Sequence, residues 1–134
     1  MRPYRALSVA ILAGCLAAAA GMFLMEIESR YLPEASGWKA PLESVLVSIL
    51  TLSPGLVAGY LAPRSGFAAG SIAGLLASVL SSIYAAALDV GPIVEKLNKS
   101  AIPEEVTWAL TAVVIGGICG IAGAAVAREK WNAF

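Results

Sequence analysis

The residue pairs Pro54-Gly55 and Gly116-Gly117 are the best candidates for chemistry in this chain, because each falls in the middle of a long apolar segment. Proline lacks a backbone N–H and clashes with the preceding helical turn, so Pro54 is expected to bend or interrupt a helix. Two helices interrupted at matching depth would expose backbone groups that can hold a solute or ion. These four residues therefore form a candidate helix break or binding site.

The alternative is that the same four residues only shape the packing of helices. The apolar segments around them contain no charged residue, and the chain has no histidine. Proton-coupled transport generally needs an ionisable group within the membrane. In size and number of apolar segments the chain resembles the small multidrug-resistance exporters, but it lacks the glutamate that those proteins require in their first segment. The sequence therefore favours the packing interpretation.

Other kinds of site are not indicated by the sequence. It has no cluster of metal-ligand residues, no nucleophile beside a base and no phosphate-binding loop. Cys15 and Cys119 are expected to be free thiols inside apolar segments. Nine basic and nine acidic residues cancel, so there is no basic surface for nucleic acid. We expect a protein that is not an enzyme and holds no cofactor or metal.

Four apolar segments must position these residues. They contain no charged residue and have 20, 20, 24 and 22 residues: Ala6–Met25, Ser44–Pro63, Ser65–Leu88 and Val106–Ala127. A bilayer core about 30 Å thick needs about 20 helical residues. Charged residues make up only 13% of the chain, against about 25% in soluble domains. The sequence predicts an all-α membrane protein in which residues 1–134 form one domain with four transmembrane helices.

The first segment has a second interpretation. Leu12-Ala13-Gly14-Cys15, preceded by Arg2 and Arg5, resembles the lipobox of bacterial lipoprotein signal peptides, which would be cleaved before Cys15. However, Leu16–Met25 continues apolar for ten more residues. That length favours a retained membrane span.

The connections and charges predict an orientation. The short turn at Ala62–Gly66 makes the second and third spans antiparallel, so the chain should form two antiparallel hairpins. Five basic residues lie at one side of the spans, with Glu129 as the one acidic residue there: Arg2, Arg5, Arg64, Arg128 and Lys130. The positive-inside rule then places both termini in the cytoplasm, in a cytoplasmic (inner) membrane. On the outer side, Pro92–Ser100 is expected to form a short amphipathic helix.

Small residues recur at every fourth position and predict close helix packing. The third span carries the longest such row: Gly66, Gly70, Gly74, Ser78, Ser82 and Ala86. The other spans carry shorter rows: Ala10, Gly14 and Ala18; Gly55 and Gly59; Ala112, Gly116, Gly120 and Ala124. Because Gly59 and Gly70 lie at similar distances from Arg64, the second and third rows are expected to contact each other as a glycine zipper.

The chain also shows a weak internal repeat. Three features recur at an offset of 62 residues: Pro41 and Pro103, Glu43 and Glu105, and Pro54-Gly55 and Gly116-Gly117. This spacing indicates two similar hairpins related as a parallel repeat. Coincidence in a chain rich in alanine and glycine is the competing explanation.

Two functions fit these observations. The favoured one is a structural or accessory subunit that packs in the lipid bilayer against its own copies or a larger membrane-protein complex. The alternative is an oligomeric channel or small-solute transporter with a path framed by Pro54-Gly55 and Gly116-Gly117. An enzyme acting on lipids is the least favoured, because acid–base residues are missing from the spans.

The orientation can be tested with reporter fusions at Trp38 and Asn98. Both sites lie in the longer connections, which the charge distribution places outside the cytoplasm. A reporter active only outside the cytoplasm should therefore be active at both. A fusion at Arg64 serves as the control and should be inactive, and cytoplasmic signals at Trp38 and Asn98 would contradict the predicted orientation.

Overall fold

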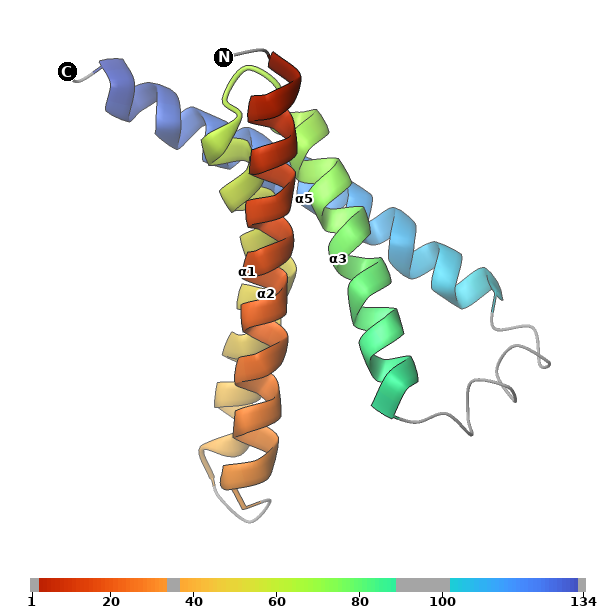
Figure 1. The fold of residues 1–134 in the computed structure, drawn as a ribbon. Coiled ribbons are helices and arrows are strands. Elements are labelled where there is room, and N and C mark those ends of the chain that lie inside the picture. Colours follow the sequence, from red (N-terminus) through yellow and green to blue (C-terminus); the bar gives the residue numbers. More distant parts are fainter. Residues whose placement is uncertain (1–2, 34–36, 89–101, 133–134) are drawn as a thin grey trace.

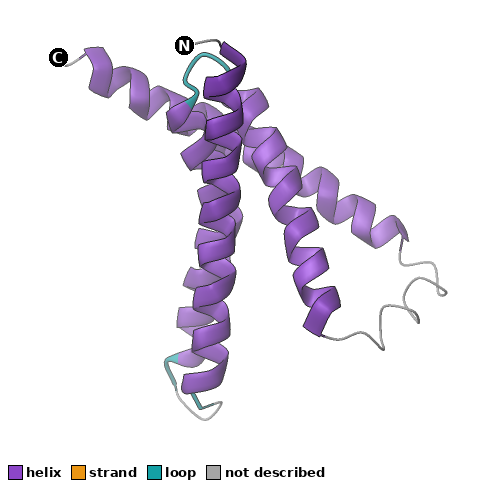
Figure 2. Cartoon of the chain, in the orientation of Figure 1, coloured by secondary structure: helices purple, strands orange, loops and turns teal. Residues whose placement is uncertain are grey.

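The computed structural model describes residues 3–33, 37–88 and 102–132, which contain four α-helices (Figures 1 and 2). They are α1 (Pro3–Tyr31), α2 (Lys39–Leu61), α3 (Gly66–Leu88) and α5 (Ile102–Asn132). Each is long and apolar enough to cross a membrane. The prediction of an all-helical chain with four potential membrane spans is therefore confirmed. The amphipathic helix expected at Pro92–Ser100 lies outside the described residues.

The helices differ from the apolar segments at their ends. At about 1.5 Å per residue, the 29 residues of α1 extend about 44 Å, beyond a hydrocarbon core of about 30 Å. The last turns of α1 therefore carry charged residues. In contrast, α2 ends at Leu61, and Ala62 and Pro63 belong to the turn rather than to the span. Proline disfavours helical geometry in the residue before it, and Ala62 has left the helical region with φ −124° and ψ 64°.

Two helices occupy central positions in the arrangement. α2 packs along α1 and also contacts α3 and α5, while α3 packs against α5 and also contacts α1 and α2. Figure 1 shows α1 running beside α2, whereas α5 crosses behind them obliquely and α3 diverges from the α1–α2 pair. The first turns of α1, the turn between α2 and α3 and the last turns of α5 lie at the same end of the molecule.

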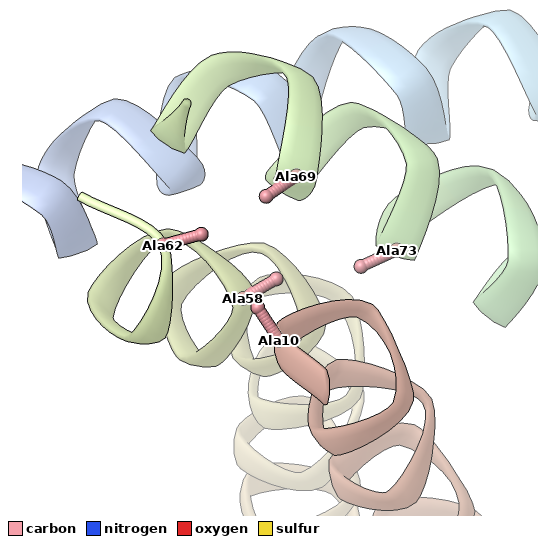
Figure 3. Packing of buried hydrophobic residues seen from close by; sticks show 5 residues of the cluster. All are labelled: Ala10, Ala58, Ala62, Ala69 and Ala73. Carbon is pink, nitrogen blue, oxygen red and sulfur yellow. The ribbon is translucent and has the colours of Figure 1, made fainter. Parts of the chain in front are cut away.

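Buried alanines join α1, α2 and α3 near that end. The cluster contains Ala10 from α1, Ala58 and Ala62 from α2 and the following turn, and Ala69 and Ala73 from α3 (Figure 3). Methyl groups keep the three backbones close and still fill the space between them. Since lipid is as apolar as the side chains, this dispersion contact is what holds helices together in a bilayer.

The glycine row of α3 packs against α5. A Cβ built on Gly70 or Gly74 would overlap a carbonyl oxygen of α5, that of Gly116 or Ala112. At the start of α3, a Cβ on Gly66 would lie 2.6 Å from the Cβ of Ala124. The row expected on the fourth span, from Ala112 to Ala124, thus forms the α5 side of this contact. Farther along α3, Ser78 is half-buried and Ser82 is exposed.

The glycines of α2 also face α5, whose backbone lies closer to them than the glycine row of α3 does. The nearest groups to a Cβ built on Gly59 all belong to Gly120, and those beside Gly70 belong to Gly116 and Gly120. Equal depth placed Gly59 and Gly70 at the same level but could not show which way each faces. α2 and α3 also meet through Ala58, Ala62, Ala69 and Ala73.

The contacts between helices do not repeat with two-fold symmetry. If two hairpins were related by a two-fold axis, the contact between α2 and α3 would have an equivalent between α5 and α1. In the described part of the chain, α1 and α5 have no contact comparable to that of α2 with α3. The packing of the four helices is therefore asymmetric, whatever the origin of the 62-residue spacing.

Replacing Gly70 with alanine should destabilise the protein. The new methyl group would meet the Gly116 carbonyl, which is backbone and cannot rotate away, so we expect a loss of about 1–3 kcal/mol. Thermal unfolding in detergent measures this. Gly37→Ala is the control, because a Cβ at Gly37 has nothing within 4 Å. Equal stability of the Gly70 variant and the wild type would contradict this packing.

Candidate functional site

The candidate residues of α2 and α5 meet where these helices cross. A Cβ built on Gly55 would lie 2.5 Å from the carbonyl oxygen of Gly116 and 2.8 Å from the Cβ of Cys119. Pro54 is fully buried beside them. On the other side, the Pro54 carbonyl oxygen would lie 2.7 Å from a Cβ on Gly14 of α1. The structure therefore brings Gly55 and Gly116 into contact, whereas the Pro54 carbonyl faces Gly14 of α1 and Gly117 faces Phe67 and Ser71 of α3.

Both helices pass through this junction as continuous helices. α2 is helical from Lys39 to Leu61 with Pro54 inside it, and α5 is helical from Ile102 to Asn132. A proline removes a single N–H from the helical ladder. Hydrogen bonds in the neighbouring turns, together with packing on both sides, can keep the helix continuous across one missing bond.

The hydroxyl groups near Pro54 do not compensate for the missing donor. Thr51 Oγ1 donates to the carbonyl oxygen of Val47 at 2.8 Å, rather than to that of Leu50, which Pro54 leaves without its usual donor. The Ser53 hydroxyl is buried and has no hydrogen-bond partner. These groups therefore do not form a polar pocket around the proline.

The space beside the four candidate residues is filled by neighbouring groups. A Cβ on Gly116 would overlap the carbonyl oxygen of Gly70 and approach the Cα of Gly74 at 3.1 Å. A Cβ on Gly117 would lie 2.6 Å from both the Phe67 ring and the Ser71 hydroxyl. None of these neighbouring groups is an acidic or basic side chain. Chemically, the junction can bring backbones into contact, with Cα–H groups against carbonyl oxygens.

A polar group that the sequence reasoning missed lies at the far ends of α1 and α3. Arg30 forms an ion pair with Glu26 at 2.7 Å, and the Tyr84 hydroxyl donates to the other Glu26 oxygen at 2.9 Å. One helical turn separates Glu26 and Arg30, and this spacing could have indicated the ion pair. The hydrogen bond from Tyr84 connects residues 58 positions apart in sequence and required the fold.

Glu28 lies on the same end of α1 but in a different environment. Its side chain is only 7% exposed, and its Oε1 atom has no hydrogen-bond partner. Glu28 is seven residues, or two helical turns, beyond Gly21, which packs against Leu50 of α2. This places Glu28 on the side of α1 that faces α2. Among the described residues, the acidic groups and cysteines form no cluster that could hold a metal ion.

The outward side of α2 carries a shallow groove of about 420 Å³, and every residue that lines it comes from α2. Ser44 and Ser48 lie along it with Val45, Ile49 and Leu52. The Ser48 hydroxyl donates to the Ser44 carbonyl at 2.8 Å, and the Ser44 hydroxyl to the Ala40 carbonyl at 3.0 Å. The hydroxyls are therefore satisfied within the helix while their oxygens face outward.

The two adjacent glycines of α5 should respond differently to substitution. Gly116→Ala sets a methyl group against the α3 backbone, so we expect a loss of about 1–3 kcal/mol. Gly117→Ala meets side-chain atoms instead of backbone: the Phe67 ring, which is 54% exposed and can turn away, and the Ser71 hydroxyl, which can rotate about its Cα–Cβ bond. Thermal unfolding of both variants in one detergent measures the difference. A Gly117 variant as unstable as the Gly116 variant would contradict the described packing.

Comparisons with known proteins leave the function to be argued from the chain itself. No family model, no curated protein and no solved structure matches it.

Proposed function

We propose that this chain is a structural or accessory subunit, without catalytic chemistry, that acts within a larger membrane-protein complex. The observation that supports this role most directly is the backbone contact between Gly55 and Gly116. These residues lie where a mid-membrane binding site was expected, and their contact leaves no room for a solute between α2 and α5. Such a bundle, held together by small residues as a glycine zipper, is rigid. A rigid bundle suits a subunit that offers a fixed surface to a partner protein.

The outward side of α2 is the surface that we assign to the partner. Most small residues of the other helices already pack within the chain, as the contacts of Gly14, Gly70 and Gly120 indicate. In contrast, Ser44, Ser48 and Thr51 lie on α2 between apolar residues, away from the contacts within the bundle. Hydroxyls at this spacing allow a second helix to approach closely and can share hydrogen bonds with it.

We further propose that the chain lies in the cytoplasmic membrane as two antiparallel hairpins, α1–α2 and α3–α5, with both termini in the cytoplasm. The placement of the first turns of α1 and the last turns of α5 at one end of the molecule supports this orientation (Figure 1). Arg5, Arg64, Arg128 and Lys130 lie at or beyond the ends of the apolar segments there, as the positive-inside rule requires of a cytoplasmic side.

An oligomeric channel is the second candidate, and the hydroxyl row of α2 is the observation that favours it. Several copies arranged around α2 would place Ser44, Ser48 and Thr51 along a shared pore. The wall would then be this outward face rather than a break at Pro54. In this arrangement the chain forms a homo-oligomer instead of joining a different protein.

Native mass spectrometry of the tagged protein, extracted gently from its own membrane, tests both functions. We expect the chain to emerge with a larger membrane protein at a fixed ratio, and Ser48→Trp to dissociate this complex. Leu16→Trp is the matched control, because Leu16 is 63% exposed on α1 and lies outside the α2 surface.

The other outcomes separate the alternatives. A closed homo-oligomer that is broken by Ser48→Trp, together with liposome flux above that of empty vesicles, would replace the accessory role with the channel. Extraction of the chain only as a monomer would contradict both proposals.

A further inference from the structure

Two arginines from distant parts of the sequence meet at one cleft near the end of the bundle where the α2–α3 turn lies. The cleft has a volume of about 490 Å³ and lies between the start of α3 and the last part of α5. Arg64 reaches it from the turn between α2 and α3, and Arg128 from α5. None of the described residues that line it is a carboxylate. The cleft is therefore a place of concentrated positive charge in a chain whose net charge is zero.

The Arg128 guanidinium is held in place without losing its charge. Its Nη2 donates to the carbonyl oxygen of Pro63 at 2.7 Å, which uses one of five N–H groups. Among the side chains that the structure describes, the ion pair joins Arg30 to Glu26. Neither Arg64 nor Arg128 has an ion-pair partner among those side chains. Both guanidinium groups can thus accept an anion, and a planar guanidinium matches phosphate oxygens well.

The backbone of α3 contributes to the same cleft. Gly66, Phe67 and Ala68 line it and are the first three residues of the helix. The first N–H groups of a helix have no partner within it, and they carry the positive end of the helix dipole. The Ala69 N–H, one residue farther, already donates to the Ser65 carbonyl at 2.8 Å. The N–H groups of Gly66, Phe67 and Ala68 therefore add to the positive potential that the two arginines create in the cleft.

The rest of the cleft is apolar and opens to the outside of the bundle. Ile121, Ala124 and Ala125 form its α5 side, and Phe67 lies opposite on α3. Phe67 and Ile121 are each 54% exposed. Arg64 lies between two uncharged segments of membrane-spanning length, and Arg128 directly follows a third. If these segments span a bilayer, both arginines lie at the depth of the lipid headgroups. A polar end and an apolar side thus adjoin as they do in a phospholipid.

We propose that this cleft binds an anionic phospholipid, with its phosphate between Arg64 and Arg128 and an acyl chain along Ile121 and Ala125. Charge complementarity selects the headgroup, and the apolar side selects a lipid over a free ion. Basic pockets between membrane helices are suited to such headgroups. The proposal goes beyond the structural role suggested above and does not depend on it.

Native mass spectrometry of the full chain, offered equal amounts of phosphatidylglycerol and phosphatidylcholine with identical acyl chains, tests the proposal. We expect phosphatidylglycerol to be retained preferentially. Arg64→Gln should weaken its retention about fivefold, the factor that corresponds to about 1 kcal/mol per basic residue near an anionic surface. The double variant with Arg128→Gln should weaken it about 25-fold if the two contacts add.

Two further variants separate a cleft from diffuse attraction. Arg5→Gln removes a basic residue that does not line the cleft, so it should change retention less than twofold. Ala125→Trp keeps every charge but fills the apolar side, so it should reduce retention as strongly as Arg64→Gln. Arg64 has no hydrogen bond among those that hold the described fold, so its variant should unfold at the wild-type temperature.

The remaining outcomes would overturn the proposal. Equal retention of the two lipids would show that the cleft does not select a phosphate headgroup with net charge. If Arg5→Gln reduces the retention of phosphatidylglycerol as much as Arg64→Gln does, the lipid is held by general attraction to a basic surface and not by the cleft. Inorganic phosphate tests the other source of a phosphate group. The cleft is a free-phosphate site instead if millimolar phosphate displaces the lipid where the same concentration of sulfate does not. The same conclusion follows if phosphate raises the unfolding temperature as much as phosphatidylglycerol does.

Discussion

The close approach of backbones along α5 is the constraint on which the rest of the structure depends. Gly116 and Gly120 of α5 are each in contact with two other helices. From α2, Gly55 approaches Gly116 and Gly59 approaches Gly120; from α3, Gly70 approaches both and Gly66 approaches Gly120. No side chain other than hydrogen fits at these points. In lipid, no hydrophobic effect drives helices together, so dispersion attraction and Cα–H to carbonyl interactions at this short distance must supply the association energy.

This constraint also decides what the mid-membrane residues can do. A binding site near Pro54 would need space and polar groups, whereas Gly55 is in contact with the α5 backbone and the helix is continuous. The close contact of Gly55 with Gly116 therefore supports the packing role proposed above rather than a solute path between α2 and α5. In that proposed role, the outward hydroxyl-bearing side of α2 is the surface offered to the partner.

The two ends of the bundle differ in their chemistry. At one end the arginines Arg64 and Arg128 lie around an apolar cleft, and a phosphate-bearing lipid would complement them. At the other end Glu26 links α1 to α3 through Tyr84, while the buried carboxyl of Glu28 faces α2. In the membrane arrangement proposed above, both ends of the bundle lie outside the hydrocarbon region, where unpaired charges are costly, so polar side chains can concentrate there.

The sequence by itself determined the class of the protein and the residues that pack. Uncharged segments of about 20 residues satisfy their backbone in lipid as helices, and small residues at every fourth position predicted the rows that pack, such as Gly116 and Gly120 of α5. Only the tertiary structure decided which rows meet. Periodicity gives a face and a depth for each helix but not the direction of that face, so it could not show that Gly59 and Gly70 both meet Gly120 of α5. For the same reason, the meeting of Arg64 with Arg128 and of Glu26 with Tyr84 could not be read from spacing, because each joins segments about 60 residues apart.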